Sequence, residues 1–213
     1  MFSMKVLKIL NAGELELINY TGSDLMCVNA ARASFGRQVS ELGEKEIKLL
    51  GRLIKDGHLS TLEHTLFTFR VKCPIFVARQ WMRHRTGVSY NERSGRYCKP
   101  EFEFYIPEMD IDRGVCSGVI DDMQRICQDS IDRYQDMVSK GCPKEVARAL
   151  LPQGMYTNFY FTCNLRSFLH FYKLRSDSHA QEEIRVYANG MMELIKTIPE
   201  QPFKYTLQFI NNA

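Results

Sequence analysis

Residues 65–84 read TLFTFRVKCPIFVARQWMRH, and two periodic patterns meet in this stretch. Apolar and polar residues alternate over 65–71, which predicts a β-strand with one buried face. Pro74 suits the first turn of a helix, and helical spacing continues to about His84. The apolar side chains expected to face the core from this helix are Ile75, Phe76, Ala78 and Met82. A strand that leads directly into a helix indicates a fold containing both.

The flanking segments extend this mixture of strands and helices. Before residue 65, residues 5–9 and 14–20 predict a hairpin, and helices are expected over 25–34, capped by Ser23 and Asp24, and over 44–55, ending at Gly57. After residue 97 we expect strands over 102–106 and 156–163, helices over 115–139, 144–150, 165–174 and 178–198, and a short helix beyond Pro199. These elements predict one α+β domain over residues 1–213, with a small mixed or antiparallel sheet packed with several long helices.

Composition excludes several classes of protein. The chain is 45% hydrophobic and 25% charged, as in ordinary globular proteins. No apolar run approaches the ~20 residues that span a bilayer, and the N-terminus lacks the pattern of a secretory signal. The seven cysteines are odd in number and include no CxxC pair, which favours reduced thiols and a cytoplasmic protein. His58 and His64 lie six residues apart, a spacing that does not favour a metal site.

Positive charge is concentrated in residues 70–99. This segment holds eight Lys or Arg and one acid, a net charge of +7, whereas the whole chain carries +3 and the remainder therefore −4. Most of these cations are arginines, whose forked donors suit phosphate, and Gly87 and Gly95 allow backbone amides to approach a ligand. Gln80 and Arg83 share a helix face. The segment therefore predicts a pocket for phosphorylated ligands.

A nucleic-acid-binding module that uses residues 70–99 is the main alternative. The interleaved tyrosines Tyr90 and Tyr97 could stack on bases. Against this reading, the basic span is short, its flanks are acidic, and the pI of 8.4 is below the ~9 typical of nucleic-acid domains. The salt dependence of retention on heparin or an oligonucleotide separates the two.

Three weaker candidates lie elsewhere in the chain. Ser60 or Thr61 could offer an anion-binding hydroxyl, or simply cap a turn. Another group, Asn164, Arg166 and His170, could align on one helical face, although a polar helix surface explains the pattern equally well. Cys98 is the only candidate for a nucleophilic thiol because it follows the basic loop, and a packed thiol is the better interpretation.

Several segments together resemble one enzyme family. RHRTGVSYNERSGRY at 83–97 resembles the signature of the flavin-dependent thymidylate synthases, written RHR, seven residues, then Ser. PIFVARQWMRHR, DGHLSTLEHTLFTF, PKEVARALLP and LRSDSHAQEEI also resemble family blocks, in the family's order, and the likeness covers about residues 14–195. Here eight residues separate Arg85 from Ser94, which indicates one extra residue within 86–88.

The resemblance implies a reaction and its cofactors. Members of the family methylate dUMP to dTMP, taking carbon from methylenetetrahydrofolate and hydride from FAD reduced by NADPH, without a cysteine nucleophile. Members are homotetramers with active sites between subunits, and we expect the same of this chain. The expected partners are the small molecules dUMP, folate and NADPH, and neither nucleic acid nor membrane.

Family likeness also assigns roles to residues, in overlapping groups. The expected FAD contacts are Ser60, Glu63, Arg83, His84, Arg85, Glu92, Asn164, Arg166 and His170, where some members have asparagine at the position of His170. The expected dUMP contacts are Gln80, Arg83, Glu92, Arg93, Ser94, Gly95, Arg96, Arg148 and Arg175. Arg175 is expected to favour ionised uracil N3, a form of electrostatic catalysis. Ser94 is expected to position the substrate as a polar group, and His58 and Tyr97 to pack against folate.

Overall fold

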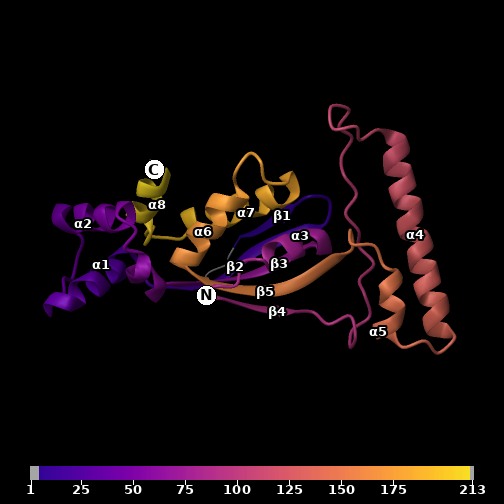
Figure 1. Ribbon diagram of the computed structural model, residues 1–213, viewed down its shortest axis with the longest axis horizontal. Helices are drawn as coiled ribbons and strands as arrows, with labels where there is room; N and C mark the ends of the chain where they lie inside the picture. Colours follow the sequence, from indigo (N-terminus) through magenta and orange to yellow (C-terminus); the bar gives the residue numbers. More distant parts are fainter. Residues whose placement is uncertain (1–4, 212–213) are drawn as a thin grey trace.

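A five-stranded sheet forms the centre of the computed structural model, which describes residues 5–211 (Figure 1). All neighbouring strands are antiparallel, in the order β1-β2-β3-β5-β4. The strands are β1 (Val6–Ile9), β2 (Gly13–Thr21), β3 (Leu66–Pro74), β4 (Val88–Glu92) and β5 (Tyr156–Asn164). The central strands β3 and β5 each run directly into a helix, so the residues at the start of those helices are fixed by the sheet.

Helices cover one face of the sheet because the strands alternate in polarity. On β3, Phe67, Phe69 and Val71 are buried, whereas Arg70 is exposed on the other face. The apolar face packs against helices α3, α6 and α7, which lie together above the strands in Figure 1. These helices are α3 (Ile75–Trp81), α6 (Leu165–Arg175) and α7 (Glu182–Lys196).

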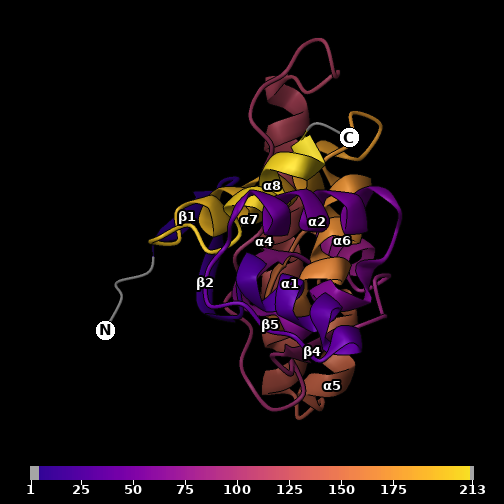
Figure 2. The same cartoon turned by 90° about the vertical axis from the view of Figure 1, so that its left-hand side faces the viewer.

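Three further helices close one end of the sheet, toward the viewer in Figure 2. They are α1 (Asp24–Arg32), α2 (Glu44–Lys55) and α8 (Lys204–Asn211). The buried carboxylate of Asp24 ties α1 to α8, accepting hydrogen bonds from the backbone N–H of Tyr205 at 2.7 Å and from the hydroxyl of Thr206 at 2.6 Å. The 3₁₀ turn Ala33–Phe35 lies between α1 and α2, and the 3₁₀ turn Leu59–His64 leads from α2 to β3.

A helical arm projects from the opposite end of the sheet (Figure 1). It consists of α4 (Ser117–Ser139), α5 (Lys144–Ala147) and the 3₁₀ turn Arg148–Leu150. Its exposed large apolar side chains are Val119, Ile126, Val146 and Leu150. Within residues 5–211, no helix combines the length and apolar character needed to cross a membrane.

The α+β class, the hairpin at 5–9 and 14–20, and the strands predicted at 65–71 and 156–163 are confirmed, whereas the helix expected over 144–150 ends at Ala147 and continues as a 3₁₀ turn. The sheet is purely antiparallel, so of the two sheet types expected the mixed one was wrong. The strand expected at 102–106 was also wrong, because only the single bridge between Phe104 and Met155 forms there. The helices expected over 75–84 and 178–198 are shorter, ending at Trp81 and beginning at Glu182.

The buried face of α3 was predicted only in part. Val77, Ala78 and Trp81 are its buried residues, whereas three of the four expected ones, Ile75, Phe76 and Met82, are only partly buried. The indole of Trp81 packs against four aromatic rings at centroid distances of 4.9–5.9 Å, those of Phe159, Phe161, Phe171 and Tyr187. Trp81 therefore anchors α3 to the core, and Arg79, Gln80 and Arg83, which lie beside it in the chain, line the cavity described below.

Candidate functional site

A cavity of about 340 Å³ opens beside α3 and the end of α6. Its lining residues are Phe76, Arg79, Gln80, Arg83, Gln153 and Arg175. Hydrogen bonds from the backbone N–H of Ile75 to Met155 and from that of Phe76 to Gln153, at 2.9 and 3.1 Å, fix the start of α3 against the chain that enters β5. The cavity thus gathers three guanidinium groups and two amides, a donor set suited to an anionic or carbonyl-rich ligand.

Arg175 is held in place by two acceptors at the cavity wall. Its Nε donates to Nε2 of His84 at 3.0 Å, and its Nη2 donates to the backbone carbonyl of Gln80 at 3.0 Å. The side-chain amide of Gln80 donates in turn to the side-chain oxygen of Gln181, just before α7. Residues of α3, α6 and the start of α7 are therefore connected around one opening, through the backbone carbonyl and the side chain of Gln80.

His84 is neutral at this site. Its ring is partly buried, lying 4.9 Å from the ring of Phe171 and 5.7 Å from that of His170 between centroids. Burial, together with the nearby charge of Arg175 and the neighbouring His170, lowers the pKa of His84 to about 4. Burial and the charge of Arg83 also lower the pKa of Arg175, whose guanidinium nevertheless stays charged at neutral pH. A neutral imidazole has one acceptor nitrogen, and because the guanidinium of Arg175 can only donate, Nε2 of His84 is that acceptor.

The turn after α3 is fastened to the start of α6. The hydroxyl of Ser167 donates to the carbonyl of Thr86 at 2.7 Å, and the backbone N–H of Asn164 donates to the carbonyl of Gly87 at 3.3 Å. Asn164 also caps α6 by accepting from the N–H of Ser167 at 2.8 Å. Residues 86–88, where one extra residue is expected, therefore lie against the N-terminus of α6.

Gly87 should not tolerate a side chain. Its φ is +63°, and a Cβ there would lie 2.6 Å from both the Asn164 side-chain nitrogen and the Ser167 hydroxyl. We expect Gly87→Ala to destabilise the fold by about 1–3 kcal/mol, from left-handed backbone strain and displacement of the α6 cap. Urea unfolding measures this loss. Gly118→Ala is the control, because a Cβ there would meet nothing within 4 Å, and equal stability of the two variants would contradict the expectation.

A second group of predicted residues lies near the start of α6. Arg166 pairs with Glu63 of the 3₁₀ turn Leu59–His64, which also carries Ser60. His170 is one helical turn beyond Arg166, and both side chains are exposed. Since Thr86 contacts Ser167, the Arg83–Arg85 segment is connected to this same helix end. His58 is exposed just before the 3₁₀ turn.

The loop after β4 forms a separate group of predicted residues near α5. Ser94 organises a tight turn, its hydroxyl accepting from the backbone N–H of Arg96 at 3.2 Å. Arg96 pairs with Glu145 at 2.7 Å. A Cβ on Gly95 would lie 3.4 Å from Cδ of Arg148, so this arginine crosses closely over the glycine. Tyr97 is 74% exposed and available for stacking.

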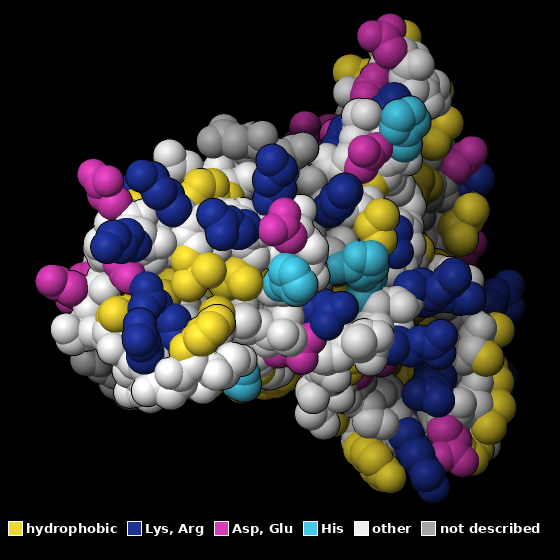
Figure 3. All heavy atoms as spheres, turned by 60° about the vertical axis from the view of Figure 1, so that its left-hand side comes forward, with side chains coloured by type: hydrophobic (Ala, Val, Ile, Leu, Met, Phe, Trp, Pro, Cys, Tyr) yellow, Lys and Arg dark blue, Asp and Glu magenta, His cyan; other side chains and the backbone are white. Residues whose placement is uncertain are grey.

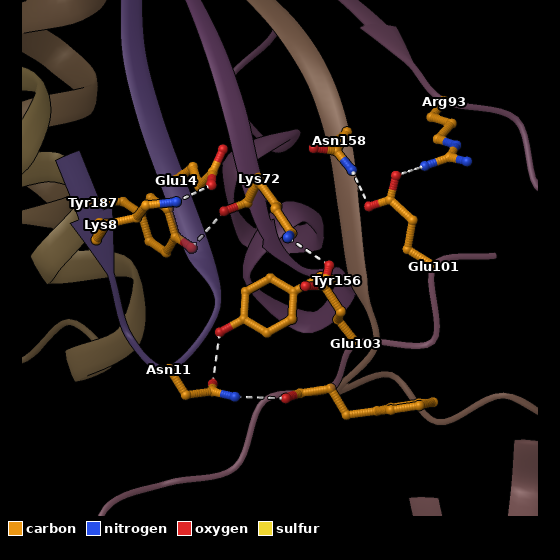
Figure 4. Close-up of polar contacts among 11 residues, drawn as sticks. Lys8, Asn11, Glu14, Lys72, Arg93, Glu101, Glu103, Tyr156, Asn158 and Tyr187 are labelled. Atoms are coloured by element: carbon orange, nitrogen blue, oxygen red, sulfur yellow. Dashed lines mark hydrogen bonds and ion pairs between the residues drawn. The ribbon is translucent and has the colours of Figure 1, made fainter. Parts of the chain in front are cut away.

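Arg93 is already engaged within the chain. Its guanidinium pairs with Glu101, and the side-chain amide of Asn158 on β5 donates to the same carboxylate at 3.4 Å (Figure 4). The Arg93 guanidinium also donates to the carbonyl of Lys99 at 3.1 Å. Glu103, which follows Glu101 two residues later, forms an ion pair with Lys72 of β3 (Figure 4). Glu92 accepts a hydrogen bond from Thr157 at 2.6 Å. These contacts hold the loop on the sheet edge.

The predicted residues thus form three groups, and not one pocket. Gln80, Arg83 and Arg175 line the cavity together, with His84 behind them. Within residues 5–211, no hydrogen bond or ion pair joins the cavity residues to Ser94, Gly95, Arg96 or Arg148. The cavity also contains two polar residues that were not predicted, Arg79 and Gln153. The spacing of Arg79, four residues before Arg83, was a usable signal, whereas nothing in the sequence indicated Gln153.

The +7 charge of residues 70–99 is partly neutralised in the fold. Arg70, Lys72, Arg93 and Arg96 pair with Glu16, Glu103, Glu101 and Glu145. On the face shown in Figure 3, Lys and Arg side chains lie in separate groups among acidic, apolar and neutral side chains. The nucleic-acid alternative, which would use a continuous basic stripe, stays a prediction to be tested by salt-dependent retention on heparin.

Comparison with known proteins gives consistent matches over most of the chain. The family model described as thymidylate synthase complementing protein matches residues 16–200. A flavin-dependent thymidylate synthase of Thermotoga neapolitana is 45% identical over 191 residues, covering 88% of each chain. One of Treponema denticola is 36% identical, covering 91% of this chain and 79% of the relative. The crystal structure of the UMP/dUMP methylase PolB from Streptomyces cacaoi, bound with 5-Br dUMP, superposes with a TM-score of 0.86 at 29% identity, covering 97% of each chain.

Proposed function

The chain belongs to the flavin-dependent thymidylate synthase family, and we propose on this basis how its residues methylate dUMP to dTMP with FAD as cofactor. The observation that carries the residue assignment is the cavity that gathers Arg79, Gln80, Arg83 and Arg175. NADPH as reductant and methylenetetrahydrofolate as carbon donor are part of the proposal. FAD, when bound and reduced, supplies hydride chemistry. The remaining steps belong to side chains of this chain.

The residues near the start of α6 fit a dinucleotide cofactor. Arg85, Arg166 and His170 are exposed side chains near the first two turns of α6, and the two guanidinium groups suit a pyrophosphate. The ion pair between Arg166 and Glu63 orients the arginine from the neighbouring 3₁₀ turn. We propose that these groups hold FAD, with the other family positions Ser60, Arg83, His84, Glu92 and Asn164.

The cavity is proposed to hold the uracil ring of dUMP. Arg175 presents a fixed positive charge that stabilises negative charge developing on N3 and its flanking carbonyls. Gln80 and Arg83 add an amide and a second guanidinium to the same wall. Because these groups are positioned before the substrate arrives, little reorganisation accompanies the reaction.

The loop around Ser94 is proposed to hold the phosphate of dUMP. Gly95 leaves room for a close approach, and Arg96 and Arg148 lie beside it. Arg93 supports this loop through Glu101, which makes it a positioning group as well as the dUMP contact that family likeness implies. Ser94 then orients the turn as a polar group through its contact with the N–H of Arg96.

The separation of loop and cavity within one chain supports an assembly in which subunits share sites. We propose a homotetramer in which the loop of one subunit meets the cavity of another. The exposed apolar side chains of the projecting arm, among them Val119, Ile126 and Val146, supply surface for such contacts. His58 and Tyr97, both exposed, are proposed to pack against folate. The seven cysteines, none in a disulfide, favour a cytoplasmic location.

A turnover assay tests the proposed function. Purified protein with FAD, NADPH, methylenetetrahydrofolate and dUMP should form dTMP, and omission of FAD from flavin-stripped protein should stop the reaction. Ser94→Ala should retain measurable turnover, because the hydroxyl shapes the loop and forms no bond to the substrate. A covalent adduct between dUMP and Ser94 of the parent enzyme, with no turnover by a variant that binds FAD and dUMP normally, would overturn that role.

A further inference from the structure

His84 contacts Arg175 directly, in addition to the flavin contact proposed above. A guanidinium has five N–H donors in a fixed fork. In Arg175 the Nε donor is used by Nε2 of His84 and one Nη2 donor by the carbonyl of Gln80, both at 3.0 Å. Three donors remain, and Arg175 lines the cavity. The two acceptors, Nε2 of His84 and the carbonyl of Gln80, therefore fix the orientation of the guanidinium, and its three remaining N–H donors are available to a ligand in the cavity.

We propose that His84 is a positioning residue whose unprotonated Nε2 holds Arg175 in the orientation that binds the pyrimidine ring. This role rests on the proposed function, because it takes the cavity as the site of the ring. It goes beyond the flavin contact expected from family likeness, since it assigns His84 an acceptor role toward a residue of the same chain.

The surroundings of His84 keep its imidazole able to accept. From α6 it is faced by Arg175, His170 and the ring of Phe171. Its chain neighbours are Arg83 and Arg85, and the hydroxyl of Tyr90 on β4 donates to its carbonyl at 2.8 Å. Within residues 5–211, no carboxylate pairs with His84, so nothing stabilises an imidazolium there. A proton on Nε2 would remove the acceptor and place a third cation beside Arg83 and Arg175.

The backbone around His84 is fixed independently of its side chain. The Tyr90 hydroxyl also lies 3.1 Å from the carbonyl of Trp81, and the N–H of His84 donates to that same carbonyl at 3.0 Å. A change confined to the imidazole therefore alters the hydrogen bond to Arg175 while the turn is retained. This makes the position suitable for side-chain replacement.

Equilibrium binding of dUMP to the FAD-loaded protein tests the proposal. His84→Gln keeps an acceptor near the position of Nε2, and its amide does not titrate, so this variant should bind dUMP within about 3-fold of the parent. His84→Phe keeps ring packing against Phe171 but removes the acceptor, and should weaken binding by about 10-fold or more. His84→Met, similar in length to glutamine, serves if the phenylalanine variant does not fold. Flavin absorbance confirms equal FAD occupancy in each variant.

A double-mutant cycle with Arg175→Ala separates positioning from a direct role. If His84 acts through Arg175, the double variant should bind dUMP no more weakly than Arg175→Ala alone. Losses that multiply would overturn the proposal, as would a glutamine variant as weak as the phenylalanine one. If Arg175→Ala itself binds dUMP as tightly as the parent, the cavity assignment fails and this proposal fails with it. If the two losses multiply while Arg175→Ala alone strongly weakens dUMP binding, the positioning role of His84 fails but the cavity assignment stands.

Discussion

Replacing Arg175 with alanine should lower the rate of dTMP formation by about 10²–10³-fold. Loss of one preorganised group that stabilises developing charge has an effect of this size. Arg175 meets that description because its guanidinium is fixed at two points before any ligand binds. The rate is measured at saturating dUMP, so that weaker binding does not account for the loss.

Lys173→Ala is the matched control for the Arg175 variant. Lys173 is an exposed cation on the same helix, two residues earlier, and it does not line the cavity. Its removal changes net charge equally and should leave the rate within about 2-fold of the parent, as expected for a surface charge. Similar losses in the two variants would indicate a general effect of charge, and a fully active Arg175→Ala would remove the residue from catalysis.

Replacing Trp81 with alanine should give the largest loss of stability, about 3–5 kcal/mol. The indole is fully buried among four aromatic rings on α6, α7 and β5. Its removal leaves a large cavity beneath α3, the helix that carries Arg79 and Gln80. We therefore expect weaker dUMP binding together with a lower free energy of unfolding.

Urea unfolding followed by circular dichroism measures the effect at Trp81. Phe35→Ala is the comparison, because this ring is 78% exposed and its removal should cost under about 0.5 kcal/mol in the isolated chain. If Trp81→Ala has the same free energy of unfolding as the parent, the aromatic cluster does not anchor α3 to the core.

Regular periodicity made most of the fold predictable. The alternation on β3 and the helical spacing of α2 arise from burial of one face, and burial is encoded locally. Residues 88–92, which form β4, were expected to be part of a loop because Ser89, Asn91 and Glu92 are polar. The segment is an edge strand, and its identity comes from pairing with β5. The opposite error occurred at residues 102–106, where alternation is present but side-chain contacts to Asn11 and Lys72 hold the segment.

Site residues that belong to a recognisable sequence motif were predictable. Residues that reach the site, or pair within it, through contacts between distant segments were not. Gln80, Arg83 and Arg175 were predicted and lie around one cavity. Gln153 reaches it only because its carbonyl accepts from the start of α3, a contact between distant segments. Arg93 was expected to contact dUMP, and its pairing with Glu101 across the loop had no signal in the sequence. Its role toward dUMP stays a prediction.

An absorbance spectrum of the purified protein tests the central claim most directly. FAD-loaded protein should show a flavin band in the visible blue, NADPH should bleach it, and dUMP should perturb it, because the cavity proposed to hold the uracil ring is lined by Arg83 of the Arg83–Arg85 segment. Arg83→Ala should lose flavin and dUMP together. A colourless protein that takes up no FAD, or a flavin band unaffected by both NADPH and dUMP, would contradict the account.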